Sequence, residues 1–282
     1  MENKGWEFAV STTNIKTKNF KWTTMLNLGF NTNKILDESV AENSTNPSRE
    51  GYPIGAIFAY KTAGIDKDGY PLFVGKDGSI LTAKEFFNLN RFGASGLSAE
   101  EQRNLYTYMG TSEPKCSGGF INTFEWGNWQ LNLNFVFNLG MKVRVQPSYS
   151  LVYYDRGLNT NKDILDRWTP ANPYSSLPGL MTNNVGRSDE YTHYEEYNTY
   201  SMLDIWVRKQ NYCRLQSVRI GYRIPSKLLA PLGITSASLS FEGRNLLVIA
   251  SDYENYLDPE TMGNPFAQPI PKSYIFGLNV TF

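Results

Sequence analysis

The chain has 282 residues, and its 27 Lys and Arg balance 27 Asp and Glu, so the formal net charge is zero. A chain with balanced charge lacks the basic excess of nucleic-acid-binding proteins, so no nucleic-acid partner is expected. No run approaches the roughly 18 apolar residues of a transmembrane helix. Membrane-spanning strands stay possible, because only half of their side chains are apolar. The aromatic share of 14% is high, but soluble sugar-binding domains can share that excess.

Two alternating segments open the chain. In residues 5–15 the apolar side chains of Trp6, Phe8 and Val10 alternate with smaller or polar ones, and residues 20–31 repeat the pattern from Phe20 to Phe30. Side chains alternate across a strand, so both segments are predicted strands with one apolar face. The short segment 16–19 between them predicts a hairpin.

Residues 34–116 show no comparable alternation. They contain turn signals, a weak strand near residues 56–60, and a capping box from Ser98 to Glu101 that predicts a short helix toward Tyr108. The segment 66–69 begins like a calcium-binding loop, but Pro71 stands where an EF-hand needs glycine. A plain turn is the preferred interpretation.

A second hairpin is predicted around Gly127-Asn128, a dipeptide that suits a two-residue turn. That turn sets Trp126 opposite Trp129 on the apolar face and Glu125 opposite Gln130 on the polar face. Alternation continues from residue 129 to residue 140, and Asn122 is the exception on the apolar parity of the preceding strand. The turn chemistry and the hydrophobic pattern agree on one register.

The third hairpin spans residues 212–223 and 235–246, with a helical turn between prolines at 225–231. Its polar parity carries four charges. These are Arg219, Arg223, Glu242 and Arg244. Residues 272–282 form a last strand with five apolar side chains on one face. These are Tyr274, Phe276, Leu278, Val280 and Phe282.

The connections between these seven strands predict a membrane topology. If the last strand descends to the periplasm, segments 16–19, 127–128 and 224–234 fall on the periplasmic side, and segments 34–116, 141–211 and 247–271 fall outside. Short periplasmic turns, long outer loops and a girdle of aromatic side chains are typical of outer-membrane barrels. The expected girdle comprises Phe20, Trp22, Trp126, Trp129, Tyr222 and Phe282. The predicted fold is all-β: the C-terminal segment, about seven strands, of a transmembrane antiparallel β-barrel with long extracellular loops.

Several short motifs, in order along the chain, resemble the SusC/RagA family of TonB-linked outer-membrane transporters. They occupy residues 3–7 with 20–22, 51–55, 63–66 with 71–72, 114–115 with 118–119, 167–170, 212–215 with 221–225, 243–246 and 276–282. The resemblance implies a 22-stranded barrel with an N-terminal plug, a TonB-contacting segment and a SusD-like lipoprotein partner. It further implies import of oligosaccharides or peptides across the outer membrane of a Gram-negative bacterium, in contact with outer-membrane lipid. Residues 1–282 would be the C-terminal part of such a barrel, with the plug domain and signal peptide absent.

Candidate site residues fall into three groups. Tyr153, Tyr154, Trp168 and Tyr174 could stack on sugar rings at the barrel mouth, or equally could pack the outer loops together. The charges at 219, 223, 242 and 244 are expected to line a wet lumen wall against the plug, and the last strand is expected to serve membrane assembly.

No enzymatic motif, cofactor or metal site is expected. His193 is the only histidine and is interpreted as a surface residue, and Glu195-Glu196 and Asp189-Glu190 as solvated loop carboxylates. Cys116 and Cys213 are interpreted as two separate thiols. The alternative function is a soluble all-β module that binds carbohydrate. A third hypothesis is a glycan-active enzyme, but the sequence shows no set of catalytic residues that supports it.

Overall fold

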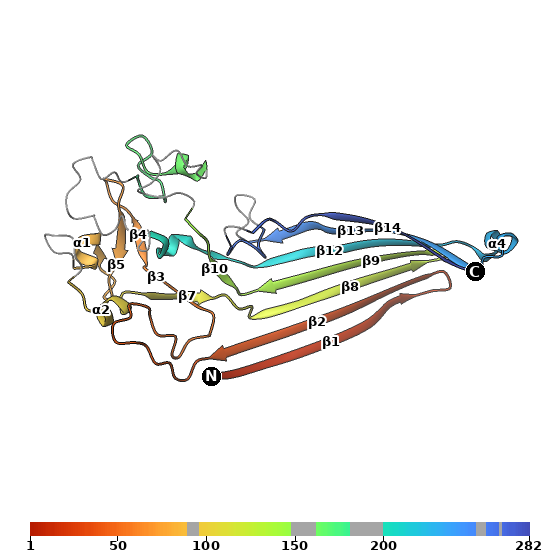
Figure 1. The fold of residues 1–282 in the computed structure, drawn as a ribbon, viewed down its shortest axis with the longest axis horizontal. Helices are drawn as coiled ribbons and strands as arrows, with labels where there is room; N and C mark the ends of the chain where they lie inside the picture. Colours follow the sequence, from red (N-terminus) through yellow and green to blue (C-terminus); the bar gives the residue numbers. More distant parts are fainter. Residues whose placement is uncertain (89–95, 148–161, 181–199, 252–257, 265–266) are drawn as a thin grey trace.

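The computed structural model describes residues 1–88, 96–147, 162–180, 200–251, 258–264 and 267–282. One antiparallel sheet dominates it, and its strands follow each other in chain order across the sheet (Figure 1). The strands are β1 (Glu2–Lys16), β2 (Phe20–Lys34), β8 (Cys116–Trp126), β9 (Trp129–Leu139), β12 (Tyr212–Arg223), β13 (Ser236–Ala250) and β14 (Ser273–Thr281). The strands occupy the segments that the alternation predicts, and β1 and β14 form the two edges of an open sheet.

The register brings the apolar side chains of neighbouring strands onto one face. Phe20 of β2 lies opposite Trp126 of β8, which lies opposite Trp129 of β9, which lies opposite Tyr222 of β12. The predicted pairing across the Gly127-Asn128 turn, Trp126 with Trp129, is confirmed. A slip of one residue would move a whole strand's apolar set to the other face, so this consistent register creates one continuous apolar surface.

A β-bulge in β12 changes which of its side chains lie on the apolar face. The register shifts between Leu215 and Ser217, and Asn245 on the neighbouring β13 adopts a left-handed backbone with φ of 55°. An extra residue in one strand turns the following side chains to the opposite face. Leu215 therefore joins the apolar face, and Arg214 turns to the polar face.

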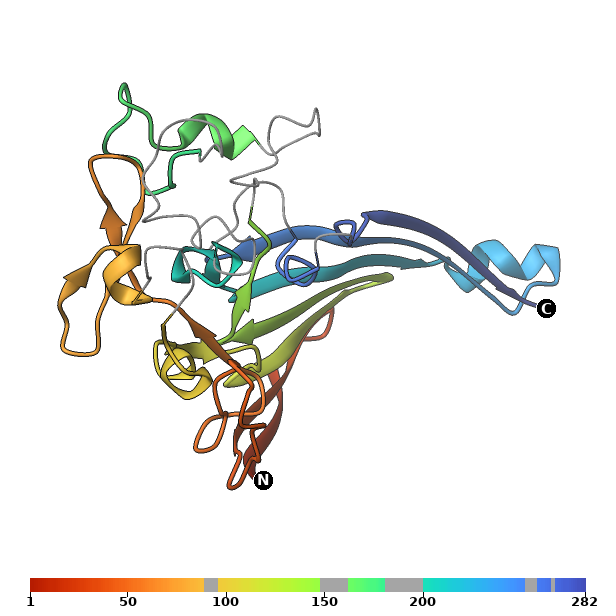
Figure 2. The same ribbon diagram turned by 60° about the vertical axis from the view of Figure 1, so that its left-hand side comes forward.

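The connections differ sharply between the two ends of the sheet. At one end the strands are joined by residues 17–19, by the two-residue turn, and by α4 (Ser226–Leu229) with η3 (Ala230–Leu232). At the other end the described parts of segments 35–115, 140–211 and 251–272 lie together, and they are here called the loop cap (Figures 1 and 2). The predicted sorting into short and long connections matches this arrangement.

In the part of the chain that the structure describes, the loop cap contains only the following short elements. Its strands are β3 (Ala56–Ala59), β4 (Thr62–Ile65), β5 (Pro71–Val74), β6 (Ile80–Leu81), β7 (Thr107–Thr111), β10 (Lys142–Arg144) and β11 (Val207–Lys209). Its helices are α1 (Ala83–Phe86), α2 (Ala99–Arg103), η1 (Lys162–Asp166) and η2 (Asp204–Trp206). No helix in the described ranges is long and apolar enough to cross a membrane.

The hydrophobic core lies in the loop cap and is built from all three long connections. Its buried residues are Tyr60, Tyr70, Phe73, Ala83, Phe86, Phe87, Val145, Tyr200, Leu203, Trp206 and Met262. The rings of Phe73 and Phe86 stack with centroids 4.7 Å apart. Burying several aromatic side chains supplies a large hydrophobic contribution, so segments far apart in sequence are held together as one unit.

The capping box at Ser98 is confirmed, because the Ser98 side chain accepts from the Glu101 backbone and the Glu101 side chain accepts from the Ser98 backbone. The expected extension of the helix toward Tyr108 was wrong, since α2 ends at Arg103. Tyr106 instead stacks on Tyr60 at 4.3 Å, and residues 107–111 pair with β3. Packing of the cap core outweighs continuation of a short exposed helix.

Candidate functional site

The apolar face of the sheet is uncovered in the part of the chain that the structure describes. Trp126 is 69% exposed and Phe276 is 81% exposed, and the buried core does not include this face. Monomeric soluble proteins rarely expose contiguous apolar patches of this kind, and larger ones mark contact with a membrane or partner. The sheet face is therefore a contact surface.

Aromatic rings collect on this face near the short-turn end. The rings of Trp129 and Tyr222 lie 4.5 Å apart, and Trp22 stacks on Phe124 at 5.6 Å. Amphipathic rings favour the water-to-hydrocarbon boundary of a membrane. These rings stand at the end of the sheet where the girdle was predicted.

A small polar network interrupts the apolar face at Thr24 and Asn122, two residues farther from the short turns than Trp22 and Phe124. The side-chain oxygen of Asn122 accepts from the Trp22 indole at 3.0 Å and from the Thr24 hydroxyl at 2.6 Å. Asn14 then donates to the Thr24 hydroxyl at 2.7 Å. Mutual hydrogen bonds reduce the cost of placing these groups on an apolar surface, which accounts for Asn122 as the exception in the sequence pattern.

The four predicted lumen charges all lie on the polar face. Arg219 stands opposite Glu242, and Arg244 donates from Nε to Glu242 at 2.6 Å. Arg219 and Arg223 line a polar hollow of about 270 Å³ near the short turns, together with Glu125 and Asn132. The structure brings these charges together on one wall, while their role toward a plug stays a prediction.

The last strand pairs with β13 and leaves its apolar side chains uncovered. Phe276 lies opposite Phe241 with ring centroids 5.0 Å apart, and Tyr274 stacks on the same ring. Leu278 lies opposite Leu239, and Val280 opposite Ala237. Phe282 is almost fully exposed. The role of this strand in assembly stays a prediction.

A buried ion cluster fastens the third long connection to the sheet. Arg214 on β12 donates from Nη2 to Asp258 and from Nε to Glu260, each at 2.5 Å. Only 3% of Arg214 and 5% of Asp258 are exposed. Removing one partner of a buried pair leaves an uncompensated charge, so this cluster fixes the loop position. Sequence analysis missed it, because the partners come from separate elements.

Of the four aromatic residues predicted to stack on sugar, the structure describes Trp168 and Tyr174, and their environments differ. Trp168 packs its ring on the backbone of Gly69 and Gly179, where it joins two cap segments. Tyr174 is 96% exposed. Tyr153 and Tyr154 lie outside the described residues, as do residues 189–196 with His193 and the two carboxylate pairs. Stacking of sugar on these aromatics stays a prediction.

The predicted plain turn at 66–69 is confirmed. The Asp66 carboxylate accepts from the backbone N–H groups of Asp68 and Tyr70 at 2.8 and 2.9 Å. Within the described ranges, no group of three or more His, Cys, Asp or Glu side chains could hold a metal ion. Cys116 and Cys213 are free thiols.

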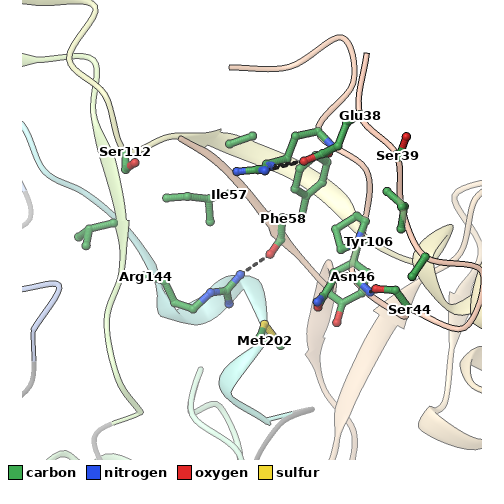
Figure 3. A pocket seen from close by; sticks show the side chains of 16 residues that line it. Glu38, Ser39, Ser44, Asn46, Ile57, Phe58, Tyr106, Ser112, Arg144 and Met202 are labelled. Atoms are coloured by element: carbon green, nitrogen blue, oxygen red, sulfur yellow. Dashed lines mark hydrogen bonds and ion pairs between the residues drawn. The ribbon is translucent and has the colours of Figure 1, made fainter. Parts of the chain in front are cut away.

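A cavity of about 690 Å³ opens within the loop cap (Figure 3). One wall is the strap of residues 38–49, and the other includes Ile57, Phe58, Val143 and Arg144. At the strap, Arg49 donates to the Glu38 carboxylate from Nε at 2.8 Å and from Nη2 at 2.5 Å. These hydrogen bonds hold the pKa of Glu38 below its usual value.

Arg144 is the second cation of the cavity, and its environment differs. Its Nη1 donates to the Ser201 carbonyl at 2.9 Å, and its Nη2 donates to the Phe58 carbonyl. Burial lowers the pKa of this guanidinium. Among the described ion pairs none involves Arg144. No sequence motif singles out Arg144, because its neighbours arrive from residues 58 and 201.

An open, curved antiparallel sheet with one apolar face, short turns at one end and a folded loop cap at the other defines the class of this fold: a mostly-β protein built on one large antiparallel sheet. Comparison with known proteins supports the class. No family model matches the chain. TonB-dependent receptor P26 of Formosa agariphila is 27% identical over all of this chain and 29% of that protein. TonB-dependent receptor P3 of the same organism is 25% identical over 92% of this chain and 25% of that protein.

Solved structures agree in fold. The RagAB peptide transporter superposes with a TM-score of 0.74 at 24% identity, covering 99% of this chain and 29% of that chain. The RagAB peptide importer in its open-open state gives a TM-score of 0.71 at 23% identity. The chain thus spans under a third of the length of the relatives it matches. The resemblance to SusC/RagA-type TonB-dependent receptors is confirmed.

Proposed function

We propose that this chain supplies the C-terminal strands and outer loops of a TonB-dependent importer in the outer membrane of a Gram-negative bacterium. The apolar face contacts outer-membrane lipid, the polar face lines the lumen against a plug, and the loop cap lies outside the cell. The similarity to TonB-dependent receptors over the full chain supports this assignment.

The observation that carries the proposal is the uncovered apolar face with its aromatic band. A soluble β-sandwich would cover that face with a second sheet, and the described core lies in the loop cap instead. Lipid provides such a cover, since barrel strands in membranes alternate apolar-out and polar-in. Short turns at the aromatic end and long connections at the other agree with the same orientation.

The function that follows is uptake of oligosaccharides or peptides. TonB would supply energy through a plug, and a SusD-like lipoprotein would cover the outer loops. The charged polar wall with Arg219 and Glu242 supports contact with a plug or polar solute. In this proposal, residues 1–282 form the C-terminal strands and outer loops of the importer.

Membrane fractionation tests the proposal. We expect the chain to sediment with outer membranes, resist extraction by alkaline carbonate, and enter solution only with detergent. Cysteine labelling gives the orientation: Leu133→Cys should react poorly with a water-soluble maleimide, and Asn134→Cys should react when the lumen is open. A protein that is monodisperse without detergent, and whose introduced cysteines at 133 and 134 react equally, would instead favour the soluble carbohydrate-binding module. In such a module the 96% exposed Tyr174 could stack on a sugar ring.

A further inference from the structure

One side of the loop-cap cavity combines apolar side chains with a cation that has no carboxylate partner among the described residues. Ile57, Phe58, Val143 and Met202 line it near Arg144 (Figure 3). Arg144 carries five N–H donors, and two backbone carbonyls accept from two of its nitrogens. Donors therefore remain for a ligand.

Charge balance separates Arg144 from the other cation of the cavity. Arg49 is neutralised by Glu38 through two side-chain hydrogen bonds, while the partners of Arg144 are neutral carbonyl oxygens. A partly buried charge with neutral partners is costly, and an arriving anion relieves that cost. The planar guanidinium matches a carboxylate in particular, because the two can form parallel hydrogen bonds.

The backbone carbonyls also hold the guanidinium in place before any ligand arrives. Phe58 belongs to β3 and Ser201 to the segment before η2, so two separate parts of the cap fix the position of the Arg144 head group. Preorganisation of this kind lowers the ordering cost of binding. The apolar residues beside it provide space for an aliphatic or aromatic group.

We propose that this cavity binds the C-terminal carboxylate of a short peptide through Arg144, with the apolar last side chain of the peptide against Ile57, Phe58 and Met202. This rests on the proposed import function and deepens it by naming a substrate class. An acidic sugar offers the same carboxylate, but polar side chains that could partner its hydroxyl groups, such as Ser39 and Ser44, lie on the strap, whereas Ile57 and Met202 lie beside Arg144 (Figure 3). The geometry therefore favours a peptide.

The test is calorimetric binding to the full chain in detergent micelles, with N-acetyl-Leu-Phe as the free acid, the same peptide as its C-terminal amide, and digalacturonate. We expect the acid to bind about 10- to 100-fold more tightly than the amide, because a charge-assisted pair is lost in the amide. Equal affinities for acid and amide, or binding of neither peptide, would overturn the proposal. Binding of digalacturonate without the peptide acid would overturn the peptide assignment.

Variants locate the effect. Arg144→Met should reduce the acid's affinity to that of the amide, and Arg144→Lys should restore only part of it. The matched control is Arg167→Met, since Arg167 also donates to a cap carbonyl, Ile164, but does not line the cavity. Equal loss in both variants would refute the site.

Two readouts keep the outcomes distinct. Hydrogen exchange of residues 200–206, around the buried Trp206, reports whether Arg144→Met keeps the cap folded. If it does not, the acid-against-amide comparison on the unchanged protein decides. Membrane sedimentation tests the proposed function separately, since Arg144 lies outside the sheet. A chain that sediments with membranes and ignores the carboxylate would refute only this inference.

Discussion

Arginine placed along β9 should reveal which face of the sheet meets lipid. Leu133 lies four residues beyond Trp129 on the same face, opposite Asn122 and Val218. At about 3.4 Å per residue this is roughly 14 Å along the strand, or about 10 Å along the membrane normal at a tilt near 40°. The apolar band is about 25 Å tall, so Leu133 lies near its middle.

The expected costs follow from that depth. Leu133→Arg should lower the free energy of unfolding by about 2–4 kcal/mol, the cost of arginine on the lipid face at midplane. Trp129→Arg should incur only about 0–1 kcal/mol for the charge, before the lost ring contact with Tyr222 is counted. Asn134→Arg, on the polar face, should be nearly neutral.

Denaturant unfolding from lipid vesicles measures these values, in the intact barrel where the strand is paired on both sides. A soluble sandwich would also penalise Leu133→Arg, so the profile along the strand decides. Lipid predicts a cost that peaks mid-strand and falls toward both ends. Costs that follow side-chain volume, with Phe137 and Trp129 as sensitive as Leu133, would refute the lipid-facing assignment.

Three further predictions concern the loop cap and its attachment. Asp258→Asn should cost up to about 3–5 kcal/mol, because it removes the buried carboxylate of the ion cluster and leaves Arg214 only the more exposed Glu260. Thermal unfolding measures this cost, and an unchanged midpoint would contradict the role of the ion cluster. Gly69→Ala should destabilise the cap more than Gly78→Ala. Both glycines have φ near +85 to +90°, but an added Cβ at Gly69 would lie 2.5 Å from the Trp168 ring, whereas one at Gly78 would meet open space. Equal shifts of the unfolding midpoint would refute the Trp168 packing. Because the pKa of Glu38 is lowered in the folded chain, its contribution to strap stability is present above the unfolded pKa near 4.3 and is lost as pH falls through the lower folded pKa. Hydrogen exchange of residues 49–54, followed against pH, should show this loss, and Glu38→Gln should remove the pH dependence.

The sequence by itself determined the strands and their faces. Alternation has a period of two, and the Gly127-Asn128 turn fixes one register, so the pairing of Trp126 with Trp129 could be predicted without coordinates. The same local patterns predicted the capping box at Ser98 and the turn at Asp66. Each of these features depends on residues within a few positions of one another.

Only the tertiary structure decided how the long connections fold. The cap core joins residues from three segments, such as Tyr60, Trp206 and Met262, and the irregular segments carry no periodic pattern that would pair them. The ion cluster of Arg214 depends on a bulge that turns this side chain to the polar face, beside a loop more than 40 residues away. Arg144 became a candidate site only because the carbonyls of Phe58 and Ser201 meet there. Contacts between distant segments follow from packing and charge balance in three dimensions, which local patterns do not encode.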